Sequence, residues 1–173
     1  MEGKQRILFV CTGNTCRSPM AAGLLRHLLA EESEGDKFVI ESAGLAAWPG
    51  APAAGQAVEV AAGEGIDLGQ HRARQLTAEM VAAATMIITM TAEHRDAVLA
   101  LTPEAEDKVF TLIELGAGGK SGAGLDIGDP FGGSLEIYRR TWEEIARHLE
   151  RAWHQLFFPP GREREREKRI NNS

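Results

Sequence analysis

The sequence is poor in cysteine, has no excess of basic residues and contains no long apolar run. Its two cysteines, Cys11 and Cys16, lie in one short segment, so they cannot cross-link distant parts of a secreted fold. No stretch approaches the roughly 20 apolar residues of a membrane span, and the first apolar run, of about five residues, is too short for a secretory signal. A net charge of −6 provides no basic surface for nucleic acid. We therefore expect a cytoplasmic protein that binds neither membranes nor nucleic acid.

Short apolar runs alternate with helical patterns along the chain. The runs at residues 7–10, 38–40, 86–89 and 109–112 predict strands. Apolar spacing or alanine-rich composition predicts helices after Ser18-Pro19 and over residues 53–64, 77–84, 91–101 and 134–156. This alternation predicts an α/β fold of three layers, in which helices cover both faces of a four-stranded parallel sheet.

The composition predicts one domain followed by a tail. We expect a single domain over residues 1–158, long enough to bury a core, and a flexible charged tail over residues 159–173, where arginine and glutamate alternate. The glycine-rich stretch 116–133 is too long for a tight connection, and loops of this length are often functional.

The octapeptide CTGNTCRS at residues 11–18 carries the strongest chemical signal. It follows the first predicted strand and precedes a helix, so its backbone amides and the helix start favour a bound dianion. We expect the same field to lower the pKa of Cys11 and make it a nucleophile. The planar fork of Arg17 suits two phosphoryl oxygens. The segment predicts phosphoryl transfer through cysteine.

Other loop residues have expected supporting roles. We expect Gly13 to permit a turn that a side chain would obstruct, and Asn14 to adopt a left-handed conformation that braces the loop. Ser18 is expected to cap the helix, and it also offers a hydrogen bond to the thiolate. Cys16 is a packing residue, a disulfide partner that protects Cys11, or a metal ligand. The histidines show no short-range ligand spacing, so we expect no metal.

The reaction also needs a proton donor for the leaving group. Asp129, held by Pro130, is the candidate, although Asp126 is close and Asp-Pro is a common start of a turn. His71 is expected to be a structural hydrogen-bonding residue rather than a base.

The segment VCTGNTCRSPMA at residues 10–21 resembles the signature of the low-molecular-weight protein tyrosine phosphatase family. Further landmarks follow in the family's order at residues 42–44, 71–76, 89–91 and 129–130, so the resemblance covers roughly residues 5–156. It implies a four-stranded parallel sheet flanked by helices and no cofactor. The roles that it implies are nucleophile for Cys11, phosphate-binding arginine for Arg17, general acid for Asp129, loop support for Asn14 and His71, and thiolate support for Ser18.

Within this family, the chain is most similar to the bacterial protein-arginine phosphatases. Thr15 and the segment DPFGGS at residues 129–134 carry that similarity. A hydroxyl at Thr15 and the carboxylate of Asp129 suit a guanidinium leaving group, whereas a tyrosine ring would leave the hydroxyl without a partner. Phe131 would flank the flat guanidinium. Trp48 instead favours phosphotyrosine as the substrate, because tyrosine-directed relatives place an aromatic residue against the substrate ring. The alternative is that Trp48 only anchors its loop.

We therefore expect a protein-arginine phosphatase that works through a phosphocysteine intermediate on phosphorylated proteins, as a monomer or weak dimer. The alternative is a phosphotyrosine protein phosphatase. Arsenate reduction on this scaffold generally needs further cysteines, and this chain has none beyond Cys16. A catalytically inactive protein that only binds a phosphorylated ligand is a third possibility, and the presence of Cys11, Arg17 and Asp129 argues against it. The expected substrate-binding and phosphate-binding residues are Thr12, Gly13, Asn14, Thr15, Cys16, Ser18, Trp48 and Phe131.

Overall fold

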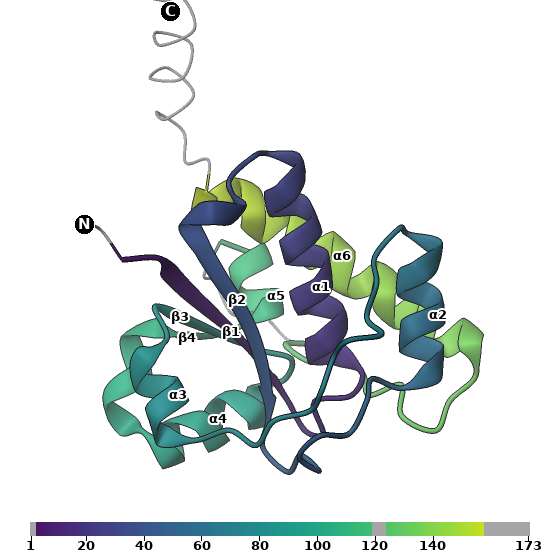
Figure 1. The fold of residues 1–173 in the computed structure, drawn as a ribbon. Coiled ribbons are helices and arrows are strands. Elements are labelled where there is room, and N and C mark those ends of the chain that lie inside the picture. Colours follow the sequence, from purple (N-terminus) through teal and green to yellow (C-terminus); the bar gives the residue numbers. More distant parts are fainter. Residues whose placement is uncertain (1–2, 119–123, 158–173) are drawn as a thin grey trace, which may run out of the picture.

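A four-stranded parallel sheet forms the centre of the protein. The computed structural model describes residues 3–118 and 124–157. The strands are β1 (Gln5–Cys11), β2 (Phe38–Gly44), β3 (Met86–Thr89) and β4 (Val109–Thr111), and they lie in the order β2-β1-β3-β4. All three neighbouring pairs are parallel. The predicted sheet is confirmed (Figure 1).

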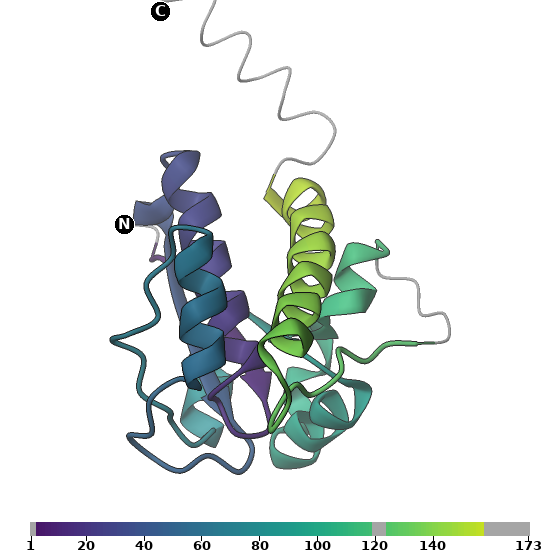
Figure 2. The same cartoon turned by 90° about the vertical axis from the view of Figure 1, so that its right-hand side faces the viewer.

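Helices cover both faces of the sheet because side chains of β1 alternate between two apolar cores. Ile7 and Phe9 pack with residues of α1 (Arg17–Glu31), α2 (Gly55–Gly63), α5 (Leu112–Gly116) and α6 (Leu135–Phe157). Leu8 and Val10 pack with residues of α3 (Ala78–Ala83) and α4 (Ala92–Leu101). Successive side chains of a strand point to opposite faces, so this central strand contributes to both cores. Figure 2 shows α1, α2 and α6 side by side on one face.

The predicted helices are all present, and the main difference lies after β4. The run 109–112 is predicted as strand, but Leu112 begins α5, because Thr111 and Glu114 form a capping box that starts a helix there. Two short 3₁₀ helices, η1 (Gly35–Lys37) and η2 (Pro103–Lys108), were not predicted.

The last helix carries the predicted apolar stripe. Tyr138, Trp142, Ile145, Leu149 and Ala152 are buried along α6. The side chain of Leu156 and the predicted tail 159–173 lie outside the described residues, so the division into domain and tail stays a prediction. Across residues 3–118 and 124–157, no helix is long and apolar enough to cross a membrane.

Several loops meet at the carboxyl ends of the strands. Cys11, the last residue of β1, pairs with Gly44, the last residue of β2. The backbone N–H of Ala46 donates to the carbonyl of Thr12 at 2.9 Å, and that of Ile127 donates to Met90 at 2.9 Å. In parallel sheets this edge is where ligands bind. The loop after β1 is therefore enclosed by segments that are distant in sequence.

Gly44 should be intolerant of any side chain. A Cβ there would lie 2.7 Å from the carbonyl oxygen of Thr12 and 3.0 Å from the backbone nitrogen of Asn14. We expect Gly44→Ala to lower the free energy of unfolding by about 1–3 kcal/mol in urea denaturation.

The matched control is Gly23→Ala in α1. A Cβ at Gly23 would approach only flexible side chains, the nearest being Cδ2 of Leu68 at 2.7 Å. The gain of about 0.5–1 kcal/mol for alanine in a helix offsets part of that crowding. Equal losses for the two variants would contradict the tight approach of β2 to the loop.

Candidate active site

Asn14 holds the loop between β1 and α1 in place. It has a φ of 56°, in the left-handed region, and is fully buried. Its Nδ2 donates to the hydroxyls of Ser18 at 2.8 Å and Ser42 at 2.9 Å. Its Oδ1 accepts from the backbone N–H of Arg74 at 2.9 Å. These bonds tie the loop to α1, to β2 and to the segment after α2, as a bracing residue would require.

His71 supports the same residue from outside the loop. Its Nε2 donates to the carbonyl oxygen of Asn14 at 2.6 Å, because a carbonyl can only accept. Burial lowers the pKa of His71, and neighbouring arginines lower it further, while the bond to Asn14 acts in the opposite direction. A neutral, hydrogen-bonding His71 is consistent with a structural role.

Gly13 does not have the importance expected for it. Its φ is not positive, and a Cβ there would meet only Oγ1 of Thr15, at an ordinary 3.7 Å. The expectation that a side chain would obstruct the turn is wrong, because Asn14 supplies the left-handed residue. The glycine that packs tightly against this loop is instead Gly44.

Ser18 lies beside the sulfur of Cys11, not at the helix cap. Helix α1 begins at Arg17 with Cys16 as its N-cap, and no side chain caps it. The expected capping by Ser18 is therefore wrong. The hydroxyl of Ser18 instead lies 2.9 Å from Sγ of Cys11. Since this hydroxyl already accepts from Asn14, its proton can be donated to the sulfur.

The pKa of Cys11 departs from expectation. Burial raises the pKa of this thiol above its ordinary value, since only 2% of the residue is exposed. Hydrogen bonds from Ser18, the charge of Arg17 and a backbone hydrogen bond from Asn14 lower it, but burial is the larger effect. The expectation of a lowered pKa is therefore wrong for this structure, because desolvation outweighs the field of the loop.

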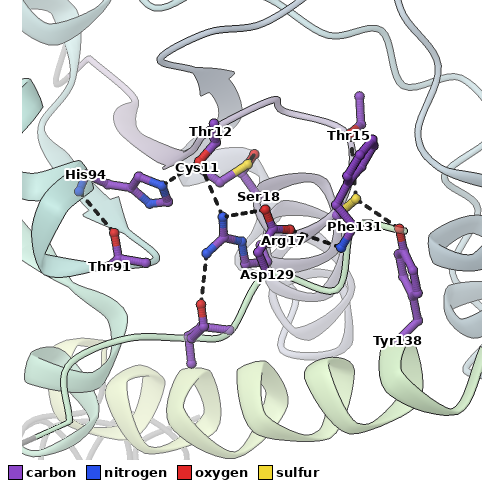
Figure 3. A network of polar contacts seen from close by, with 12 residues as sticks. Cys11, Thr12, Thr15, Arg17, Ser18, Thr91, His94, Asp129, Phe131 and Tyr138 are labelled. Carbon is purple, nitrogen blue, oxygen red and sulfur yellow. Dashed lines mark hydrogen bonds and ion pairs between the residues drawn. The ribbon is translucent and has the colours of Figure 1, made fainter. Parts of the chain in front are cut away.

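Arg17 is buried at the base of the loop. One end of its guanidinium, Nη1, donates to the carbonyl of Ile127 at 2.8 Å. The other, Nη2, lies 3.4 Å from Oγ1 of Thr12 and 3.5 Å from Oδ2 of Asp129 (Figure 3). Its Nε is buried and has no partner among the described residues. Arg17 thus combines a fixed orientation with an unused donor, which suits an oxyanion.

The candidate proton donor Asp129 and its neighbour Asp126 have different surroundings in the structure. Asp129 is half exposed, approaches Arg17 and accepts from the backbone N–H of Phe131 at 3.1 Å. Asp126 accepts from the backbone N–H of Ala92 at 2.9 Å and thereby holds the start of α4. Only Asp129 lines the pocket above Cys11.

A pocket of about 310 Å³ brings most of the predicted residues together. Its walls include Trp48 and Phe131, which are 82% and 78% exposed. Asn14, Ser18 and His71 do not line it but support the loop from behind. Its lining residues are Cys11, Thr12, Gly13, Thr15, Cys16, Arg17, Ala46, Trp48, Asp129 and Phe131. Among residues 3–118 and 124–157, no group of three or more His, Cys, Asp or Glu side chains is placed to hold a metal.

Two residues near the pocket were not predicted. The Nε2 of His94 lies 2.9 Å from Oγ1 of Thr12, and the hydroxyl of Tyr138 lies 3.3 Å from Sγ of Cys16. Both cysteines are free thiols in this structure. A separation of 82 residues hides the His94 contact from any local pattern, although His94 follows the landmark at residues 89–91 closely.

Known proteins share this sequence and arrangement. The family model of the low molecular weight phosphotyrosine protein phosphatases matches residues 6–167. A protein-arginine-phosphatase of Geobacillus stearothermophilus is 42% identical over 87% of this chain and 95% of its own length. The probable low molecular weight protein-tyrosine-phosphatase EpsP of Ralstonia nicotianae is 39% identical over 85% of this chain and 92% of its own length.

A solved structure agrees with these relatives. It is a mutant of the YwlE arginine phosphatase with a phosphorylated active site serine, and it matches with a TM-score of 0.81 and 37% identity over 89% of this chain and 97% of its own.

A parallel α/β fold with a cysteine, an arginine and an aspartate around one strand–loop–helix pocket defines a cysteine-dependent phosphatase, a hydrolase of phosphorylated groups. The chain belongs to the low molecular weight phosphotyrosine protein phosphatase family.

The hydrogen bond to Ser18 should be measurable at the sulfur. Because this bond favours the thiolate, we expect Ser18→Ala to raise the pKa of Cys11 further. The pH dependence of alkylation by iodoacetamide, followed at Cys11 by mass spectrometry, gives this pKa. Ser42→Ala is the control, since Ser42 accepts from the same Asn14 nitrogen, whereas Ser18 is the hydroxyl that lies beside the sulfur. An unchanged pKa in Ser18→Ala would contradict the role of this bond.

Proposed function

We propose that the protein hydrolyses phosphoarginine in proteins. The observation that carries the proposal is the pocket itself, in which the Thr15 hydroxyl and the Asp129 carboxylate accompany Cys11 and Arg17. A guanidinium group carries several N–H donors. The Thr15 hydroxyl can accept from one of them, and a protonated Asp129 can accept through its carbonyl oxygen and donate its own proton to the leaving nitrogen. The name of the Geobacillus relative, a protein-arginine-phosphatase, supports the same substrate.

The proposed reaction has two displacements. The Cys11 thiolate attacks phosphorus in line, the P–N bond breaks, and Asp129 donates its proton to the leaving nitrogen. Arg17 and the loop amides hold the phosphoryl oxygens. Asp129, now a carboxylate, takes a proton from water as the water attacks phosphocysteine. The S–P bond breaks, and inorganic phosphate and the thiolate are released.

The surroundings of the sulfur bear on the first step. Burial disfavours the thiolate, and the Ser18 hydroxyl and the Arg17 charge oppose that effect at the attacking atom.

The proposal also places the enzyme in the cytoplasm. A reducing compartment would keep both Cys11 and Cys16 as thiols.

Hydrolysis of phosphotyrosine is the competing function. The exposed Trp48 at the pocket wall and the EpsP relative favour it. The deciding experiment compares kcat/KM for an arginine-phosphorylated protein and a phosphotyrosine peptide, with Cys11→Ser as the inactive control. We expect a clear preference for phosphoarginine. Equal kcat/KM for the two substrates, or a higher value for the phosphotyrosine peptide, would contradict the proposal.

Thr15 should control this preference. Replacing its hydroxyl by an alkyl group removes a partner for the guanidinium and suits an aromatic ring. We expect Thr15→Ile to reduce the ratio of kcat/KM for phosphoarginine over phosphotyrosine by about tenfold or more. Thr15→Ser keeps the hydroxyl and should keep the ratio. A ratio that is the same in Thr15→Ile as in the wild type would exclude Thr15 as the selecting residue.

Asp129 and Asp126 provide a matched pair for the proton donor. We expect Asp129→Asn to lower kcat by about 10²- to 10⁴-fold, because an amide cannot supply the proton. Asp126→Asn should keep kcat near the wild-type value and lower only the free energy of unfolding, since Asp126 binds the start of α4. Steady-state kinetics of both variants tests this. A large loss of kcat in Asp126→Asn alone would reverse the assignment.

A further inference from the structure

His94 is a buried titratable residue that the proposed reaction does not use. It lies in the first turn of α4, where its backbone N–H donates to the Thr91 hydroxyl at 3.0 Å. Only 5% of the residue is exposed. Its imidazole is directed at Thr12, whose Oγ1 lies 2.9 Å from Nε2 (Figure 3). The backbone and the ring are therefore both held in place.

The neighbours of His94 determine which ring nitrogen carries the proton. Burial and the charge of Arg17 lower the pKa of His94 to about 4, although Asp129 and Asp126 act in the opposite direction, so the ring is neutral at pH 7. Its Nδ1 is buried and has no partner in the part of the chain that the structure describes. A buried N–H without a partner is rarer than an acceptor without one. The neutral ring is therefore assigned a proton on Nε2, which donates to Thr12.

Thr12 then has both of its acceptor positions occupied. The guanidinium of Arg17 has no acceptor, so its Nη2 can only donate to Oγ1 of Thr12, at 3.4 Å. Nε2 of His94 donates to the same oxygen. The single proton of the hydroxyl is left for a third direction. Thr12 is exposed and lines the pocket above Cys11, so that direction includes the pocket.

We propose that His94 is a positioning residue that turns the Thr12 hydroxyl into a hydrogen-bond donor for the phosphoryl group. This inference rests on the proposed function only in requiring a phosphoryl group in the pocket, whichever side chain carries it. Phosphoryl oxygens are acceptors, so a hydroxyl that donated to His94 would present only lone pairs to them. The state of one ring nitrogen thus decides whether Thr12 attracts or repels the ligand.

The tautomer can be observed directly in the wild-type protein. In ¹⁵N-labelled protein at pH 7, we expect the His94 signals to show a protonated Nε2 and an unprotonated Nδ1. The His94→Gln variant assigns the signals by their disappearance. A proton on Nδ1 in the wild-type protein would overturn the inference.

Kinetics tests the consequence for binding. Inorganic phosphate serves as inhibitor and p-nitrophenyl phosphate as substrate. We expect Thr12→Val and His94→Ala each to raise the Ki of phosphate and the KM by about tenfold, with a smaller change in kcat. Thr12→Ser keeps the hydroxyl, and His94→Gln offers an N–H donor in place of Nε2. Both should restore most of the affinity, which a merely structural role would not predict.

The double variant separates this inference from the proposed function. If His94 acts through Thr12, His94→Ala should add little to the effect of Thr12→Val. Additive losses in the double variant would overturn the inference without contradicting the proposed function. Absence of phosphoarginine hydrolysis in the wild type would instead contradict the proposed function, and the tautomer measurement would still test this inference.

Discussion

The hydrogen bonds of one buried asparagine determine the shape of the catalytic loop. Asn14 donates to Ser18 and Ser42 and accepts from the backbone of Arg74, and its own carbonyl accepts from His71. Its partners come from the start of α1, from β2 and from the segment that follows α2. The loop therefore keeps its form only while these three parts of the fold stay together. The geometry at Cys11 is a property of the whole sheet edge rather than of eight residues.

Burial and charge oppose each other within this loop. Cys11 and Arg17 are almost inaccessible, and desolvation disfavours a thiolate at the first of them. The guanidinium of Arg17 is the cation that lies near the sulfur, and its hydrogen bonds to Ile127 and Thr12 fix its orientation. A site of this kind holds its charged groups in fixed positions before a substrate arrives, which is how preorganised electrostatics lowers a barrier.

Local sequence was sufficient for the sheet and for the main chemical residues. The strand–loop–helix order around Cys11 and Arg17 lies within one short segment, so a linear sequence pattern contains it.

The remaining features of the site depend on contacts between segments that are distant in sequence. Asp126 accepts from the backbone of Ala92, 34 residues away, whereas Asp129 approaches Arg17, and His94 meets Thr12 across 82 residues. The capping box at Thr111 is visible in sequence, yet the apolar run that includes Leu112 also fits a strand. The expected helix cap at Ser18 was wrong, although its expected contact with the sulfur is present, because capping and sulfur binding need the same residue type.

The two exposed aromatic walls of the pocket have a consequence for selectivity. Trp48 and Phe131 present apolar surface to solvent, and any phosphorylated side chain that enters would cover part of it. A phenolic ring gains more free energy in this way than a guanidinium, because the ring is apolar, so the rim by itself does not select a guanidinium. Any preference for a guanidinium must then come from the polar atoms deeper in the pocket.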